Sequence, residues 1–496
     1  MGKIKQLKNN VKLDKYLKPL FVLASILFAL PSIMYLIEEK TVFKFEQYFK
    51  FLLDDSDRLN QTLIYIGIMA ILSIIYLLII KNRKEIFKST KNMFIFIAII
   101  SFIFVLVIPF TCSDVFYYLG IGRLDGEYGQ NPYYVTIEEF VNEGENSKYL
   151  EQDTVLEQGY INDWGDTTVV YGPVWTLICK VVSIFSFGNI DIGLFVFKLV
   201  NLIVHLINCY LIYKLSGKKI FTLIYGLNPF ILIEGIASVH NDMFVILFTL
   251  LSLYFLLKKK NLVISIVFIA LATAIKYFTI ILLPFMIIYY FRKESPKKRF
   301  LRCIQYGILF LAVIAIPYLL YIQDKEVLSG LFVQQEKLAK SFYVIISQYF
   351  GGFPDRIKYV KITLLGSFAI MYFFYCLVLL FKKEIKLRKE MQNANLFIIA
   401  FLFLLITNFQ IWYIMWIIPL IMWQKSENIK WIIQITLIAE LANSIFLLNS
   451  EDWPNGVPFT FVLITSILGI KVINDKRKNK KRALIFKNKL LEKNSR

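Results

Sequence analysis

The chain has 496 residues, of which 57% are hydrophobic and 16% aromatic, with a formal net charge of +20. This composition excludes an ordinary soluble domain, in which about half of the residues are apolar, and predicts an all-α polytopic membrane protein. A strongly basic soluble protein would suggest a nucleic-acid partner. Here the lysines and arginines form short clusters between apolar segments, so they indicate membrane topology and no nucleic acid.

Apolar segments of about the length needed to cross a ~30 Å hydrocarbon core recur along the chain. We expect fourteen spans, at 16–36, 62–80, 93–110, 190–213, 219–236, 243–257, 261–275, 277–291, 303–322, 360–381, 394–408, 411–424, 430–448 and 457–473. The first segment is long for a signal peptide and lacks a small-residue cleavage site, so a retained helix is expected. Segment 174–187 is also apolar, but Lys180 lies in its middle, and we interpret it as re-entrant or interfacial.

Basic clusters orient these spans, because positively charged connectors remain in the cytoplasm. The clusters are Lys3–Lys15, Lys81–Lys91, Lys258–Lys260, Arg292–Arg302, Lys382–Lys389 and the tail after Asn474. Both termini are therefore expected in the cytoplasm. The outer connectors are then 37–61, 111–172, 323–358, the turn near Gln410, and Asn449–Gly456.

The segment 111–172 differs from the rest of the chain because it carries twelve acidic residues and only two basic ones, Arg123 and Lys148. A long loop within a compact bundle tends to carry function. The chain is thus divided into N-terminal transmembrane helices (1–110), an acidic extracytoplasmic loop (111–173) in which catalysis is expected, the remaining transmembrane bundle (174–473), and a basic cytoplasmic tail (474–496).

Asp114 stands at the start of this loop, within a residue or two of the expected membrane boundary. A carboxylate there could deprotonate an acceptor hydroxyl beside a lipid-borne donor, if it lies within hydrogen-bond reach of the proton. The alternative is that Asp114 only caps or terminates the helix ending near Phe110.

Further polar motifs follow Asp114 in order, all expected at the outer face. They are Gly122-Arg123, Asn131-Pro132-Tyr133, Trp164, Tyr171-Gly172-Pro173, Asn228-Pro229, His240-Asn241-Asp242, Lys276, and Gln410-Ile411-Trp412-Tyr413. Each motif alone is weak. Their order and shared side of the membrane make the combination fairly specific.

This ordered set resembles the polytopic GT-C glycosyltransferases that use polyprenyl-phosphate sugars, and most of all the bacterial polyprenyl-phospho-mannose-dependent α-1,6-mannosyltransferases. The resemblance covers about residues 110–425 and includes Ala274-Ile275-Lys276, at a shorter spacing than the Ala-X-X-Lys of the family. Many relatives carry Trp-Asp or Trp-Gln before the Gly-Arg, where this chain has Gly120-Ile121.

The resemblance implies a GT-C-like bundle that transfers a hexose, mannose in particular, from a polyprenyl-phosphate donor to an extracytoplasmic glycan or glycolipid, with inversion. It implies that Asp114 is the general base, and that Arg123, Lys276 and His240 neutralise the departing phosphate. Sugar and acceptor contacts would come from Asn241, Asp242, Tyr117, Tyr171, Trp164, Gln410 and Trp412.

Each of these residues also has a structural interpretation. Arg123 could pair with Asp125 or Glu127, and residues 240–242 could cap the helix that begins near Met243. Lys276 could extend toward the interface, and the aromatic residues could pack in the core or form an interfacial belt.

We expect no cofactor, because cationic side chains can serve a lipid-phosphate leaving group. A divalent cation on loop carboxylates remains an alternative. The five cysteines show no paired spacing, so they indicate neither a disulfide framework nor a zinc site.

Three other functions remain open. A transporter or flippase of lipid-linked sugars predicts broken helices and charges near the midplane. A polymerase of lipid-linked glycans would move a whole oligosaccharide, and a non-catalytic scaffold would not depend on Asp114.

Overall fold

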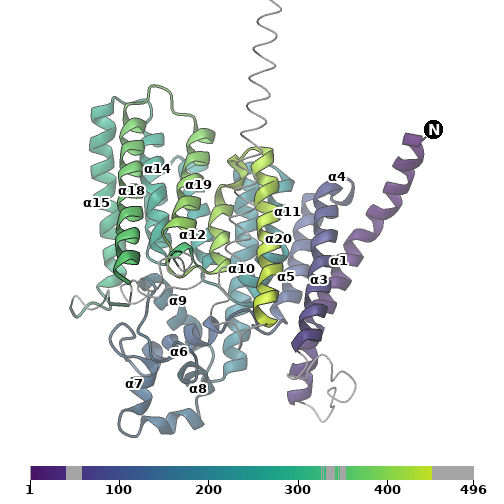
Figure 1. The fold of residues 1–496 in the computed structure, drawn as a ribbon, viewed down its shortest axis with the longest axis horizontal. Helices are drawn as coiled ribbons and strands as arrows, with labels where there is room; N and C mark the ends of the chain where they lie inside the picture. Colours follow the sequence, from purple (N-terminus) through teal and green to yellow (C-terminus); the bar gives the residue numbers. More distant parts are fainter. Residues whose placement is uncertain are drawn as a thin grey trace, which may run out of the picture.

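The computed structural model describes residues 2–40, 58–324, 327, 329, 330, 341–343, 346 and 354–448. The expected span 457–473, the turn 449–456 and the basic tail lie outside the described residues, as do most of the connectors 37–61 and 323–358. The described part of the chain is helical, with no strand (Figure 1).

Five helices among the described residues are long and apolar enough to cross a membrane, which makes the chain a multi-pass membrane protein. They are α1 (Gly2–Lys40), α3 (Arg58–Lys81), α10 (Ile190–Ser216), α15 (Pro296–Tyr318) and α18 (Pro354–Phe381). Each lies where the sequence predicts a span.

The expected count of fourteen spans is not confirmed, because many of the remaining apolar segments are short or broken. Segment 219–236 forms α11 (Lys219–Gly226) and the π-helix η3 (Ile231–Ala237), bent by 60°. The break falls at Asn228-Pro229, where proline lacks an N–H and disfavours a helical residue before it. Segment 411–424 forms a 3₁₀-helix, η7 (Ile411–Trp423).

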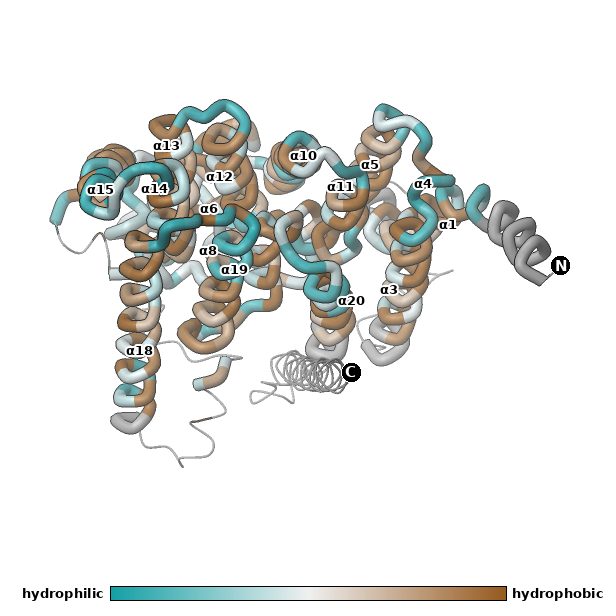
Figure 2. The backbone as a smooth tube through the Cα atoms, turned by 90° about the horizontal axis from the view of Figure 1, so that it is seen from above, coloured by the Kyte–Doolittle hydropathy of each residue, from teal (hydrophilic) through white to brown (hydrophobic). Residues whose placement is uncertain are grey.

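The other helices of the bundle are α4 (Arg83–Ile86), α5 (Thr90–Val105), α12 (Asp242–Tyr254), η4 (Phe255–Lys259), α13 (Leu262–Thr273), η5 (Tyr277–Leu282), α14 (Leu283–Tyr290), α19 (Leu387–Leu404) and α20 (Ser426–Leu448). Figure 2 shows hydrophobic residues along these helices and hydrophilic ones in the turns that join them, for example between α12 and α13.

Segment 111–172, expected to be a loop, is instead largely helical. It contains α6 (Asp114–Gly126), α7 (Ile137–Asn142), η2 (Asn146–Glu151) and α8 (Thr154–Tyr160). With α9 (Pro173–Ile184) these helices form a layer at one end of the bundle, which we call the acidic layer (Figure 1). Several of its polar residues cap these helices. Thr136 and Glu139 form a capping box on α7, and Asp153 accepts a hydrogen bond from Leu156 N at 3.0 Å at the start of α8.

Helix α9 corresponds to the apolar segment that we interpreted as re-entrant or interfacial. Its 12 residues span only about 18 Å at the rise of an α-helix, too little to cross the hydrocarbon core. Lys180 forms an ion pair with Asp125 of α6 at 2.8 Å. Helix α9 is therefore part of the acidic layer, in which it packs against α6.

The acidic layer and the basic turns lie at opposite ends of α15. At its basic first turn, Arg299 donates to the carbonyl oxygens of Leu380 and Lys382 at 2.8 and 2.9 Å. Beyond its other end, Tyr321 donates to Asp125 at 2.7 Å. The same residue accepts a hydrogen bond from Asn131 at its backbone oxygen, at 2.7 Å. The segregation of charge predicted from the sequence is thus present in the fold.

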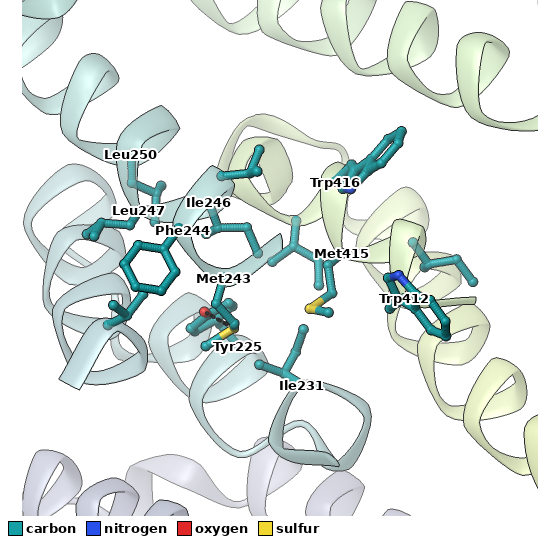
Figure 3. Packing of buried hydrophobic residues seen from close by; sticks show 14 of the residues in the cluster. Tyr225, Ile231, Met243, Phe244, Ile246, Leu247, Leu250, Trp412, Met415 and Trp416 are labelled. Atoms are coloured by element: carbon teal, nitrogen blue, oxygen red, sulfur yellow. Dashed lines mark hydrogen bonds between the residues drawn. The ribbon is translucent and has the colours of Figure 1, made fainter. Parts of the chain in front are cut away.

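The core brings η7 against α12. Figure 3 shows Met243 and Ile246 of α12 lying toward Met415 of η7, with Trp412 and Trp416 along the same stretch of η7. This packing places Trp416 beside Asp242, the first residue of α12, and Trp412 against the ring of His240.

Three polar residues inside expected spans have partners within the bundle. Lys198 donates to the Val107 carbonyl oxygen, His205 Nε2 lies 3.2 Å from the Gly226 oxygen, and Glu440 accepts from Tyr65 at 2.7 Å.

Candidate active site

Asp114 is the first residue of α6, where its negative charge is favoured by the helix dipole. Its backbone N–H donates to Cys112 Sγ at 3.1 Å, and Tyr118, one turn later, donates to its Oδ2 at 3.2 Å. The carboxylate therefore begins α6 rather than terminating the preceding span.

Asp114 contributes to the wall of a pocket at the junction of the acidic layer and the bundle, which we call the polar pocket. Six of the residues predicted from the sequence line it: Asp114, Tyr117, Trp164, Tyr171, Gln410 and Trp412. Thr167, Val170, Asn408 and Tyr413 complete the lining. The structure thus brings together residues that lie up to about 300 positions apart in the chain, with an acid among aromatic rings and amides.

A larger pocket adjoins the polar pocket, with an empty volume of about 1070 Å³. The two pockets share Val170, Tyr171, Asn408 and Tyr413. Most of the other residues that line the larger one are aromatic or aliphatic, from η5, α18, α19, η7 and the segments beside them, and we call it the apolar pocket. Its two cationic residues are Lys276 and Lys361.

Lys276 is held in place by a buried network. Its Nζ lies 2.8 and 2.9 Å from the two carboxylate oxygens of Asp242. It also lies 4.5 Å from the centre of the Tyr413 ring and 5.4 Å from that of Trp416. Trp416 Nε1 donates to Asp242 as well. The lysine is therefore a fixed cation at the wall of the apolar pocket and not a mobile surface group.

The backbone turn that carries Lys276 is fixed by the Tyr-Gly-Pro motif. Gly172 N donates to the Ile275 oxygen at 3.3 Å, and Val174 N donates to the Ala274 oxygen at 3.2 Å. A Cβ on Gly172 would come within 2.2 Å of the Ala274 carbonyl oxygen. Glycine is required at this position by close approach of two backbones.

His240 lies behind Asp114, fully buried. Its Nε2 is 2.9 Å from Glu234 Oε2 and its Nδ1 is 4.0 Å from Asp114 Oδ2. Its ring stacks on Trp412 with centroids 3.9 Å apart. Burial lowers the pKa of His240 to about 4, although the Asp114 and Asp242 carboxylates act in the opposite direction. At neutral pH the ring is uncharged, which weakens its predicted part in neutralising a phosphate.

The residue before His240 has a strained backbone. Val239 has a φ of 60°, a left-handed conformation that is a marked outlier for a β-branched residue. Such strain persists only where the surrounding structure enforces it, and it is concentrated at functional sites. Here it accompanies the sharp connection between η3 and α12, which brings Glu234 back to His240.

Besides His240, three predicted residues line neither pocket. Asn241 is fully buried, and neither polar atom of its side chain has a hydrogen-bond partner among the described residues. Asp242 faces Lys276 and Trp416. Arg123 pairs with Asp153 at 2.5 Å and with Glu127 at 3.3 Å. The pairing with Glu127 is one of the structural alternatives that the sequence left open.

Several residues of the site were not predicted from the sequence: Glu234, Trp416, Asn408 and Lys361. The sequence could have indicated Glu234, because a carboxylate inside an apolar segment must pair or line a cavity. The others are common types in ordinary surroundings, and only the fold places them here.

The described residues contain one group that could hold a metal ion. The ligand atoms of Cys112, Asp114 and His240 lie within 4.8 Å of one another. The spacing of the cysteines gave no indication of this group, because its third ligand comes from a distant part of the chain.

Comparison with known proteins gave a family match. A family model described as alpha-(1->6)-mannopyranosyltransferase, N-terminal domain, matches residues 22–292, which is more than half of the chain. No match was found among curated proteins or among solved structures.

Proposed function

Because the chain belongs to the alpha-(1->6)-mannopyranosyltransferase family, we propose that it is a GT-C type enzyme that transfers mannose from a polyprenyl-phosphate donor. The family match confirms the resemblance inferred from the motifs and identifies a membrane glycosyltransferase. The acceptor in this proposal is a hydroxyl of an extracytoplasmic glycan or glycolipid. One observation carries the proposal: a polar pocket containing Asp114 adjoins an apolar pocket containing Lys276.

The apolar pocket suits the lipid part of such a donor. Its walls are mainly aromatic and aliphatic, and its lysines are the kind of cation that a lipid phosphate needs. Lys276 lies beside Tyr171 and Tyr413, which line both pockets. A phosphate at this junction would place the sugar in the polar pocket. The fixed positive charge would then stabilise the phosphate as it departs.

Asp114 is the proposed general base. Tyr118 donates to Oδ2, which leaves Oδ1 to accept the proton of the acceptor hydroxyl. The acceptor oxygen attacks the anomeric carbon as the bond from that carbon to the phosphate oxygen breaks. Because the attack comes from the face opposite the phosphate, the anomeric configuration inverts. Tyr117, Trp164 and Trp412 offer ring faces for the sugars, and Gln410 offers an amide.

The proposed orientation places the site outside the cell and both termini inside. It rests on the positive-inside rule and on the position of the acidic layer at the far end of α15 from the basic turns. Lys219, in another basic turn, donates to the Phe87 and Lys88 oxygens at 3.0 and 2.8 Å. The basic turn that holds Lys88 and the one that holds Lys219 therefore lie side by side.

The test is transfer of radiolabelled sugar from polyprenyl-phosphate mannose, with glucose and other hexose donors in parallel, by membranes that contain the protein. Asp114→Asn should reduce transfer by about 10²- to 10⁴-fold, the usual contribution of a general base. Asp163→Asn removes an exposed carboxylate of the same layer and should leave transfer unchanged.

Equal transfer by wild type and Asp114→Asn would contradict the mechanism. Absence of transfer from every donor would favour a transporter, flippase or polymerase of lipid-linked sugars.

A further inference from the structure

Three side chains beside the polar pocket converge in the manner of metal ligands. Cys112 Sγ, an Asp114 carboxylate oxygen and a His240 ring nitrogen lie within 4.8 Å of one another. Two come from the turn that begins α6 and the third from the connection that precedes α12. One ion could therefore join the acidic layer to the bundle.

His240 is held as a metal-binding histidine usually is. Its Nε2 lies 2.9 Å from Glu234 Oε2, without the geometry of a hydrogen bond. Its Nδ1 faces Asp114, the ring is fully buried, and neither ring nitrogen has a hydrogen-bond partner among the described residues. A carboxylate on the far nitrogen is the common second-sphere partner of a histidine ligand, and the stacked Trp412 ring restricts rotation further.

We propose that Cys112, Asp114 and His240 bind a thiophilic divalent cation of the zinc class, with the fourth coordination position open to the polar pocket. Thiolate and imidazole ligands suit zinc, whereas magnesium and calcium prefer oxygen ligands. The thiolate and the carboxylate together neutralise the two positive charges. The proton of the Cys112 thiol leaves as the ion binds.

Other charged groups near His240 are compatible with this ion. Glu234 Oε2 lies 2.9 Å from the far ring nitrogen and adds no positive charge. Lys276 is the nearby cation, and its charge is compensated by Asp242, which it contacts through both oxygens. The charged side chains around His240 therefore do not exclude a cation beside Asp114.

Binding of this ion would inhibit transfer. The cation occupies the carboxylate that takes the acceptor proton, so the ion and the general-base role exclude each other. This consequence depends on the proposed function, whereas binding of the ion does not. The free enzyme would be active, and zinc would inhibit it by binding to its general base, Asp114.

The test measures binding first. The purified full-length protein is treated with a chelator, then dialysed against increasing zinc, and bound zinc is counted per chain. Wild type should bind about one ion at this group. Cys112→Ser should bind at least about tenfold more weakly, since even losses of outer-shell partners cost that much. Cys303→Ser, which removes another half-buried free thiol in α15, is the matched control and should bind as wild type does.

Cobalt provides a readout that folding alone does not change. Wild type and Cys303→Ser should show the near-ultraviolet band of a thiolate bound to Co²⁺, and Cys112→Ser should lack it. If wild type binds no zinc, or if Cys112→Ser binds zinc and cobalt as wild type does, the site is wrong.

The activity measurement separates this inference from the proposed function. Zinc should inhibit transfer by wild type, and inhibition of Cys112→Ser should require at least about ten times more zinc. If the chelated enzyme is inactive and zinc restores it, the inhibitory role is wrong. Binding without transfer from any donor would overturn the proposed function and leave the site intact.

Discussion

Lys276 contacts both carboxylate oxygens of Asp242, at 2.8 and 2.9 Å, and the pair is buried beneath the rings of Tyr413 and Trp416. Asp242 was predicted to contact sugar and Lys276 to contact phosphate. The geometry suggests different roles for the two residues: Asp242 orients the lysine, and Lys276 faces the apolar pocket. A cation held in this way loses little entropy when it meets a phosphate.

Removal of Asp242 should therefore destabilise the fold. In Asp242→Asn the lysine charge remains buried without a full counter-charge, which costs about 3–5 kcal/mol. The measurement is the thermal midpoint of the purified protein in detergent. Asp242→Asn/Lys276→Met removes both charges and should recover much of the loss. If the double variant is no more stable than the single one, the pair is not the source of the effect.

Alanine at Gly172 should disturb the turn that carries Lys276. The new Cβ would meet the Ala274 carbonyl oxygen at 2.2 Å, so one backbone segment must move, at a cost of about 1–3 kcal/mol. We expect lower thermal stability and slower transfer. Gly307→Ala in α15, where a Cβ meets nothing within 4 Å, is the control and should be neutral or slightly stabilising. Wild-type activity in Gly172→Ala would show that the contact can relax.

Stability should depend on pH through His240. Its pKa is about 4 in the folded protein, against an ordinary value of 6.5. Between these values the unfolded chain binds a proton that the folded chain does not. Stability is therefore complete above about pH 6.5 and falls as the pH is lowered toward 4. Thermal midpoints measured with a chelator present should decline less steeply in His240→Asn. Parallel curves for the two proteins would contradict the assignment.

Arg123 should support the acidic layer rather than the donor. Its guanidinium pairs with Asp153, which caps α8. Arg123→Ala should lower the thermal midpoint with little change in the KM for the donor, and a cycle with Asp153→Ala should show a coupling of about 0.5–3 kcal/mol. Lys148→Ala breaks an exposed pair with Glu145 and should have little effect. A large rise in donor KM for Arg123→Ala alone would restore the phosphate-binding hypothesis.

The sequence was sufficient to predict an all-helical membrane protein, the separation of basic turns from an acidic segment, and the family. These features depend on local composition and on motif order, which a single chain displays directly. The same reasoning predicted that Asp114, Tyr171 and Trp412 belong to one site, and they line one pocket.

The number and form of the spans could not be predicted in the same way. Asn228-Pro229 was recognised as a motif, but hydropathy predicted one continuous span where α11 and η3 are bent by 60° at these residues. Hydropathy measures whether a segment tolerates lipid and not whether it is straight.

The tertiary structure alone decided which charges meet. Asp242 pairs with Lys276, Arg123 pairs with Asp153, and Glu234 lies beside the ring of His240. The approach of Cys112 to His240 joins residues 128 positions apart. The packing of whole helices decides these pairings, because a buried charge needs a partner and only the fold determines which opposite charge lies close enough. The sequence by itself determined the class of protein and the candidates for its site, and the packing decided the role that each candidate can play.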